Sequence, residues 1–340
     1  MDLLTAFVDR FLPSVEDEMR AVLHAVDPGT GHLIDLLRYH LGWVDKAYQP
    51  RDGQSGKRLR PVLCLLACEG CCGRWPEAVP AAAAIELLHN FSLIHDDIED
   101  QDEVRRGKPS VWSIWGEAQG INAGDTLFSI AQLAMLRLSD RGVDADTVVH
   151  ALQLFNETCV RLTGGQYLDI GFEARDDVSV DEYLAMIEGK TAALVACSCE
   201  VGALVAGAPR SQRECLRSFG HHAGLAFQMQ DDVLGIWGDP SVTGKPVGAD
   251  IVRRKKTLPL LHGMEKSGEL RSVLARGETS EGDVTRITRL LEEAGSRAYA
   301  EKLARHHYDL ALSALEDADL TEGPARGLHQ MAQRLLDRKR

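Results

Sequence analysis

Two groups of aspartates in this sequence have the spacing of a metal-binding site. The first comprises Asp96, Asp97 and Asp100, and His89 precedes it by two helical turns. At 100° per residue, His89, Asp96 and Asp100 fall within about 40° of one another on a helix. Asp97 lies about 80° away. Crowded carboxylates repel one another unless a cation lies among them, and oxygen ligands with open water positions suit Mg²⁺ bound to a diphosphate.

A solvated acidic helix face is the alternative interpretation of such a run. The residues before it, Phe91-Ser92-Leu93-Ile94, are mostly apolar, which favours a helix that enters a cleft. The second acidic group is Asp231-Asp232, which shares one helical face with Gln228 and Gly235 and has apolar neighbours. Two unrelated surface patches remain the alternative here, but two such groups on separate helices could also form one site.

Basic residues are clustered in a chain that is acidic as a whole. Arginine can donate two parallel hydrogen bonds to phosphate oxygens, whereas lysine acts as a point charge, and a lone lysine is most often solvated. With the acidic groups, these segments predict a pocket for two diphosphates, one ionised through metal ions and the other simply held. The segments contain Lys57, Arg58 and Arg60, then Arg105, Arg106 and Lys108, then Lys190, Lys245, Lys255 and Lys256.

Composition limits the possible partners. The chain has 38 basic and 51 acidic residues, a net charge of −13, and would repel a nucleic-acid backbone. Its first residues, Met1-Asp2-Leu3, carry an acid where a signal peptide needs basic residues. The most apolar stretch, 192–208, contains Glu200 and falls short of the ~20 residues that cross a bilayer. We therefore expect a cytoplasmic protein with no nucleic-acid partner and no membrane span.

Apolar residues recur at helical spacing almost throughout the chain. Leu328, Met331 and Leu335 form one stripe, and Ser179 with Glu182 has the spacing of a capping box. No run of alternating strands is evident, so helix content should far exceed the ordinary one-third or so. The sequence predicts an all-α fold, a large helical bundle in a single domain (1–340) with its site between helices.

Seven motifs, in order along the chain, resemble those of the trans-isoprenyl diphosphate synthases, the polyprenyl synthetase family of farnesyl and geranylgeranyl diphosphate synthases. The resemblance runs from about Gly56 to Pro259. The motifs are Gly56-Lys57-Arg58-Leu59-Arg60-Pro61, His89 with 96–100 and Arg105-Arg106-Gly107, Ala123-Gly124-Asp125, Gly165-Gln166 with Asp169, Lys190-Thr191, Phe227-Gln228 with Asp231-Asp232, and Lys245 through Lys255 to Thr257.

The resemblance implies the isoprenoid synthase fold around a deep central cavity with Gln166 in it, a homodimer, and three Mg²⁺ ions. Asp96 and Asp100 would bind two ions and Asp231 the third, supported by Asp97 and Asp232. The allylic diphosphate (dimethylallyl, geranyl or farnesyl) would contact Arg105, Lys190, Thr191, Gln228, Lys245 and Lys255. Isopentenyl diphosphate would contact Lys57, Arg60, His89 and Arg106.

The implied reaction is a head-to-tail condensation. The allylic C–O bond breaks, the isopentenyl double bond attacks the resulting cation, and a proton is lost to the released diphosphate. Charge that develops on the leaving diphosphate is stabilised by metal ions and cationic side chains, and a dry apolar cavity protects the carbocation.

Two positions depart from the family pattern. Gly235 stands where the second motif usually has its third aspartate, which weakens the expected surroundings of the third metal ion. Ser55 stands where a glycine is common before Gly56, and we expect a small effect.

Product length depends on the residues that precede Asp96. Phe91, five positions before it, is bulky and Ser92, four before, is small. This combination, with no insertion between Asp97 and Asp100, resembles geranylgeranyl diphosphate synthases, so we predict a twenty-carbon product; farnesyl and longer polyprenyl products remain open.

Two other classes share parts of this pattern. A terpene cyclase handles a single diphosphate and would not need Lys57, Arg60 and Arg106. A non-catalytic partner subunit would be expected to lose one aspartate pair, and both pairs are present.

Overall fold

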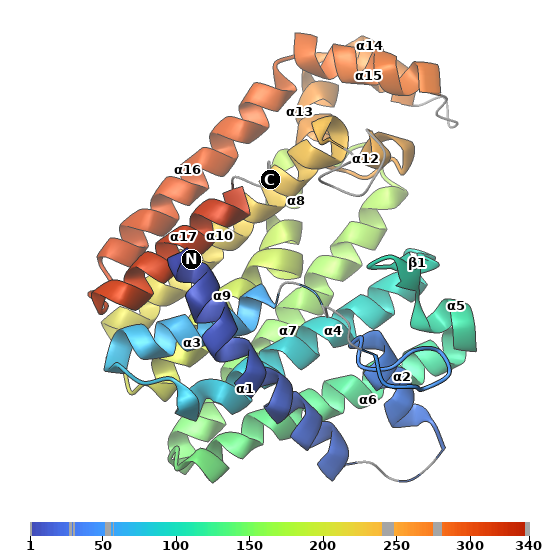
Figure 1. Cartoon of the computed structure of the whole chain (residues 1–340). Coiled ribbons are helices and arrows are strands. Elements are labelled where there is room, and N and C mark those ends of the chain that lie inside the picture. The colour runs from blue at the N-terminus through green and yellow to red at the C-terminus, as the bar shows by residue number, and fades with distance from the viewer. Residues whose placement is uncertain are drawn as a thin grey trace. The chain divides into compact units, whose positions relative to one another are not determined.

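The protein is almost entirely helical (Figure 1). The computed structural model describes residues 2–26, 29, 31–51, 56, 58–239, 248–274 and 281–336. Within these residues, paired strand is confined to a two-residue hairpin, β1 (Val104–Arg105) with β2 (Lys108–Pro109), and one isolated bridge. The predicted all-α fold is confirmed.

The chain contacts divide into two compact units. Unit 1 comprises Met1–Asn156, Ser198–Arg213 and Leu320–Gly327, and unit 2 comprises Glu157–Cys197, Glu214–Asp319 and Leu328–Arg340. The boundary falls inside α7 (Ala145–Glu173), α9 (Ala193–Val205), α10 (Arg210–Trp237) and α17 (Glu322–Leu336). The single domain predicted for 1–340 stays a prediction.

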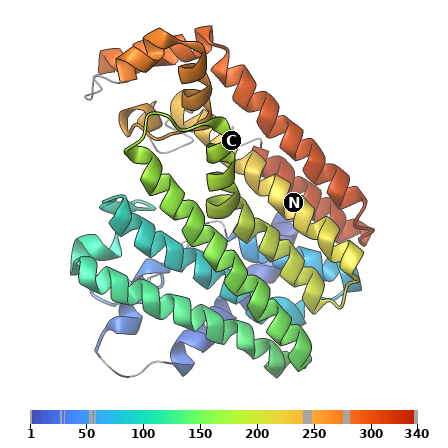
Figure 2. The same cartoon turned by 180° about the vertical axis from the view of Figure 1, so that it is seen from behind.

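Unit 1 is built around one buried helix, α4. Its alanines 81–84 are fully buried, and α4 packs against α1, α3 and α6 (Figures 1 and 2). A side chain at Gly124 of α6 would overlap the ring of His95, so this glycine lets α6 approach α4 closely. The elements are α1 (Leu3–Ala25), α2 (Leu33–His40), α3 (Leu59–Cys72), η1 (Pro76–Ala78), α4 (Val79–Glu99), α5 (Val111–Trp115), α6 (Glu117–Leu136) and η2 (Arg137–Arg141).

Unit 2 holds the later helices. Helix α13 packs against α8, α14, α15 and α16. The predicted capping box is confirmed, since the Ser179 hydroxyl accepts a hydrogen bond from the Glu182 amide and the Glu182 carboxylate accepts one from the Ser179 amide. The elements are α8 (Val180–Ile187), the π-helix η3 (Glu188–Ala192), α12 (Ala249–Val252), α13 (Leu258–Lys266), α14 (Gly268–Leu274), α15 (Glu281–Glu293) and α16 (Ser296–Glu316).

The most apolar segment of the sequence forms α9, a helix of 13 residues. Its Gly202 lies against the backbone carbonyl of Cys64 in α3, where a larger residue would overlap that oxygen. Across the described part of the chain, no helix is both long and apolar enough to cross a membrane.

One buried carboxylate links α1 to η2 within unit 1. Glu18 of α1 is 4% exposed and accepts hydrogen bonds from Arg137 Nε at 2.5 Å and from Arg141 Nη2 at 2.8 Å. Burial raises the pKa of Glu18, but these arginines lower it by more, so the pKa lies below its ordinary value. The ionised carboxylate is therefore the form that stabilises the fold.

We predict that Glu18→Gln lowers the free energy of unfolding by about 1–3 kcal/mol at pH 7, because a buried charge-assisted bond is lost. A carboxylate whose folded pKa is lowered stabilises above its unfolded pKa and loses that contribution as the pH falls through the folded pKa, so the difference shrinks in acid. Urea unfolding at pH 7 and pH 4 measures it. The control is Glu301→Gln in the exposed Arg297–Glu301 pair, where we expect less than about 0.5 kcal/mol; equal losses would contradict the assignment.

Candidate active site

The first acidic group lies at the end of α4 in unit 1, with Asp100 as the residue that follows the last helical turn. Asp97 is 1% exposed, and its Oδ1 accepts a hydrogen bond from Arg105 Nε at 2.5 Å. Burial raises the pKa of Asp97 to about 6, although Arg105 opposes the shift. Its Oδ2 is buried and has no hydrogen-bond partner among the described residues. In that part of the chain, Asp97 is thus fixed through Oδ1.

A tight hairpin returns the basic residues to this acidic group. Arg106 and Gly107 both have positive φ, 51° and 73°, as a two-residue type I′ turn requires. Strand β1 brings Arg105 to Asp97. The Arg106 guanidinium lies over Gly56, where a Cβ would be 3.0 Å from Arg106 Cζ. The Arg-Arg-Gly turn therefore directs the two arginines to different neighbours: Arg105 lies against Asp97, and Arg106 lies over Gly56.

Three of the four residues predicted to bind isopentenyl diphosphate gather in unit 1. Burial lowers the pKa of His89 well below its ordinary value, and the nearby charges of Arg60 and Arg106 lower it further. His89 is consequently neutral at pH 7, and the positive charge of the cluster resides on the two arginines. The fourth residue, Lys57, lies outside the described residues, as does Ser55.

Arg58, between Lys57 and Arg60, has a structural role of its own. Its side chain is 1% exposed and pairs with Glu16 at 2.7 Å and with Glu86 at 3.0 Å. Its φ of 45° is in the left-handed region, immediately before α3 begins. These buried ion pairs hold the start of α3, and with it Arg60, against α1 and α4.

The second acidic pair lies in α10, in unit 2. Asp232 is buried, and three protein donors surround it: Tyr183 Oη at 2.6 Å, the Leu258 amide at 3.0 Å and Gln228 Nε2 at 3.1 Å. Burial raises the pKa of Asp232 to about 7 against these hydrogen bonds. Both oxygens of Asp232 thus face protein donors, and its neighbour Asp231 is partly exposed.

The residues predicted at the allylic diphosphate adjoin this pair. Lys190 Nζ donates to Asp169 Oδ2 at 2.5 Å, and Thr191 Oγ1 donates to Gln228 Oε1 at 2.8 Å. Lys190 and Thr191 lie in η3, and such π-helical turns are frequent at functional sites. A side chain at Gly165 would overlap the Lys190 amide, so the glycine allows α7 to pack directly on η3.

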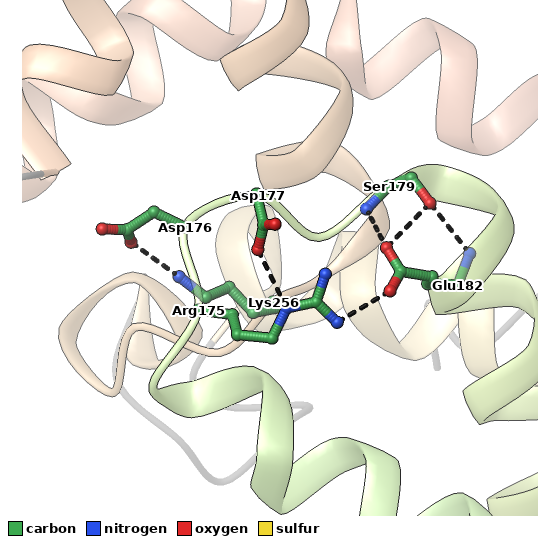
Figure 3. A network of polar contacts seen from close by, with 6 residues as sticks. All are labelled: Arg175, Asp176, Asp177, Ser179, Glu182 and Lys256. Carbon is green, nitrogen blue, oxygen red and sulfur yellow. Dashed lines mark hydrogen bonds and ion pairs between the residues drawn. The ribbon is translucent and has the colours of Figure 1, made fainter.

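Lys255 lies in a cavity of about 260 Å³ in unit 2. Arg254 and Lys256 also line it, and Leu260 and Met264 form its apolar part. Lys256 pairs with Asp176 at 3.3 Å, beside the network that joins Arg175 to Asp177 and to Glu182 of the capping box (Figure 3). Lys245 lies outside the described residues.

The remaining predicted residues are buried. Phe91 and Ser92 of α4 are each 8% exposed, and the Phe91 ring contacts those of His95, at 5.0 Å between centroids, and Phe128, at 5.3 Å. Gln166, in α7, is 7% exposed.

Sequence reasoning assigned no role to four contributors. Tyr183 and the Leu258 amide bind Asp232, Asp169 binds Lys190, and Phe128 packs on Phe91. Asp169 had a signal, because it belongs to the Gly165-Gln166 motif. The others are ordinary helix residues whose partners are distant in sequence, so no local pattern could identify them.

The donor set fits a hard cation only in part. Within the described residues, no three His, Cys, Asp or Glu side chains converge as a group able to hold a metal ion. Mg²⁺ needs no such cage, since it is usually bound by one or two carboxylates together with substrate phosphates and water. Partly exposed Asp96 and Asp100 beside the unmatched Asp97 Oδ2 suit that mode.

Comparisons with known proteins identify the family of this chain. The polyprenyl synthetase family model matches residues 42–291. The (2E,6E)-farnesyl diphosphate synthase of Mycobacterium tuberculosis is 41% identical over 329 residues, 94% of this chain and 89% of that protein. The geranylgeranyl diphosphate synthase of the same organism is 42% identical over 303 residues, 87% of this chain and 85% of that protein. The crystal structure of polyprenyl synthetase from Streptomyces coelicolor A3(2) is 36% identical, with a TM-score of 0.90, and the alignment covers 98% of this chain and 99% of that one.

The all-α fold and these relatives define the class as a trans-prenyltransferase. The chain belongs to the polyprenyl synthetase family, whose members generally use Mg²⁺.

We predict that Tyr183→Phe lowers the free energy of unfolding by about 1–3 kcal/mol at pH 8, since it leaves a buried carboxylate without one donor. The loss should be smaller at pH 5, because Asp232, with a pKa of about 7, is then protonated and its hydrogen bonds are no longer charge-assisted. Urea unfolding at both pH values measures this. Tyr48→Phe is the matched control: its ring stacks on those of His32 and Trp115, and loss of its hydroxyl should leave stability unchanged. A pH-independent loss would show that the hydroxyl does not act through Asp232.

Proposed function

We propose that this trans-prenyltransferase, acting in the cytoplasm, condenses isopentenyl diphosphate with an allylic diphosphate and releases mainly geranylgeranyl diphosphate. One observation carries the two-substrate part of the proposal, namely the cluster of Arg60, Arg106 and neutral His89. Two arginines can bind a diphosphate without a metal ion. A terpene cyclase, which handles one diphosphate, would have no use for a second anion site of this kind.

We assign the allylic diphosphate to Lys190, Thr191 and Gln228, with Lys255, Arg105 and Lys245. Three Mg²⁺ ions, held by Asp96, Asp100 and Asp231, would neutralise the diphosphate as the C–O bond breaks. Asp97 and Asp232 support this assignment as positioning residues, since each is buried and bonded to protein. Arg105 would then act on the diphosphate while it also fixes Asp97.

The reaction follows from these positions. The allylic C1–O bond breaks and its electron pair leaves with the diphosphate, whose new charge Lys190 and Lys255 stabilise. The double bond of isopentenyl diphosphate, oriented by Arg60 and Arg106, forms the new C–C bond. A proton is then lost to the departed diphosphate, which restores a double bond. We assign Gln166, which is buried, to the apolar cavity that would keep water from the carbocation.

A homodimer is part of this proposal. Large apolar side chains on α6 and α7 are exposed, and exposed patches of this kind mark protein interfaces. They are Ile121, Leu133 and Leu136 on α6, and Val149, Val160, Tyr167 and Ile170 on α7.

We expect sedimentation velocity to give twice the 37.3 kDa chain mass, and Val160→Asp to shift the protein towards monomer. A wild-type monomer at micromolar concentration would contradict the proposal.

Turnover tests the reaction directly. Purified protein with Mg²⁺, labelled isopentenyl diphosphate and each of dimethylallyl, geranyl and farnesyl diphosphate should yield prenyl products, sized after dephosphorylation. Asp96→Ala and Asp231→Ala should each lower kcat by about 10³-fold, because several kcal/mol of charge stabilisation are lost. Glu322→Ala, at a side chain 87% exposed, is the control. No incorporation with any starter would move the assignment to a cyclase or a non-catalytic subunit.

Product length tests the role of Phe91. We expect the wild type to stop at twenty carbons, Phe91→Ala to give longer products because a buried aromatic ring is removed, and Ser92→Phe to give shorter ones. Ser92→Ala, a small-to-small change, should leave the product unchanged. The relative at 41% identity is a farnesyl synthase, which makes fifteen carbons the second candidate. A fifteen-carbon wild-type product would keep the reaction and refute the chain-length assignment.

A further inference from the structure

The second acidic motif has Gly235 where the family has a third aspartate, so the space of that side chain on α10 is not filled by residue 235. Gly235 lies four residues after Asp231, and residues i and i+4 of a helix share a face with Cβ atoms about 5–6 Å apart. In the family pattern an aspartate at this position would place its carboxylate beside that of Asp231. At Gly235 the helix itself supplies no side chain there.

Another carboxylate occupies that space. A Cβ at Gly235 would lie 2.5 Å from Asp250 Cγ and would overlap the carboxylate, so any side chain at 235 must displace Asp250. Asp250 comes from the short α12, is 9% exposed, and lies close enough to Asp232 to raise the pKa of that residue. The glycine and the aspartate are therefore complementary in shape, and a larger residue at 235 requires Asp250 to move.

The main chain fixes Asp250 at this place. Gly248, with φ of 71°, begins α12 in the left-handed region, and the amide of Lys255 donates to the carbonyl of Asp250 at 3.0 Å. That bond closes a turn which places Lys255 and Asp250 at its two ends. The segment thus presents a carboxylate and a cation next to the second acidic motif.

The second motif has room for an additional oxygen ligand. Both oxygens of Asp232 face protein donors, whereas Asp231 is partly exposed. A Mg²⁺ ion bound to a diphosphate commonly takes one or two carboxylates. One carboxylate is in α10, and the nearest position for a second, that of residue 235, is filled by Asp250.

We propose that Asp250 replaces the third aspartate of the second motif: its carboxylate, in the space of the absent side chain at 235, acts with Asp231 on the cation of that site. The proposal rests on the proposed function, since it concerns the same metal-bound diphosphate. Gly235 is then a requirement of the altered site and not a loss from it. A structural role for Asp250, limited to holding the 250–255 turn, is the competing explanation.

Binding of Mn²⁺, as a paramagnetic substitute for Mg²⁺, separates these explanations. Free Mn²⁺ is measured by electron paramagnetic resonance with the full-length protein and inorganic diphosphate, for the wild type, Asp250→Asn, Gly235→Asp and the double variant Gly235→Asp/Asp250→Ala. We expect Asp250→Asn to weaken one Mn²⁺ per chain by at least about tenfold, the loss of a single charged ligand. The double variant, which returns the acid to 235 and removes its obstruction, should recover binding to within about threefold. Gly235→Asp alone should not improve on the wild type, because two carboxylates then compete for one space.

Two results would overturn the proposal. One is unchanged Mn²⁺ binding in Asp250→Asn. The other is a double variant that binds no better than Asp250→Asn, because a carboxylate at 235 would then be unable to replace that of Asp250. A purely structural role predicts this second result, and thermal unfolding of each variant confirms that folded protein is compared. Failure of the proposed function looks different, since the wild type itself would then show neither diphosphate-dependent Mn²⁺ binding nor isopentenyl diphosphate turnover.

Discussion

Repulsion between neighbouring carboxylates is the constraint on which the rest of this site depends. Each acidic motif places two adjacent aspartates at a helix segment, and the fold must tolerate them before any cation or substrate arrives. Both motifs solve this in the same way. The second aspartate is buried and bonded to protein, Asp97 to Arg105 and Asp232 to Tyr183, Leu258 and Gln228. The first, Asp96 or Asp231, remains partly exposed. Each pair thus has one buried carboxylate with protein donors and one partly exposed carboxylate, which is the one proposed as a metal ligand.

The basic residues also divide into some that stabilise the fold and others that are proposed to bind diphosphate. Arg58 is buried between two glutamates and holds the start of α3, whereas Arg60 and Arg106 place their charge beside neutral His89. Lys190 is held by Asp169. Lys190, proposed to bind an anion, is therefore positioned by the acidic Asp169. Arg60 is positioned by Arg58, whose own charge is paired with two glutamates. This arrangement limits the desolvation that an unpaired buried cation would incur.

Close approach of helices sets the remaining geometry. Gly165 lets α7 reach η3, Gly124 makes room for His95, and Gly235 makes room for Asp250. Gly165 and Gly235 lie next to residues proposed for the site, and Gly124 lies next to His95, whose ring contacts that of Phe91. A larger side chain at these positions would displace the neighbouring residue, and a displacement of about 1 Å can disturb the geometry of a site such as the one proposed.

The sequence by itself determined the helical class, both acidic motifs and most of the cationic residues. These depend on periodicity of 3.6 residues and on short spacings, which a linear pattern records directly. Tertiary structure alone decided which aspartate of each pair is buried, and that Tyr183 and Leu258, 49 and 26 residues from Asp232, are its donors. It also decided that the space beside Gly235 holds Asp250. From the sequence the glycine was a missing acid, since only the fold can bring residue 250 onto the face of α10 that residue 235 leaves empty.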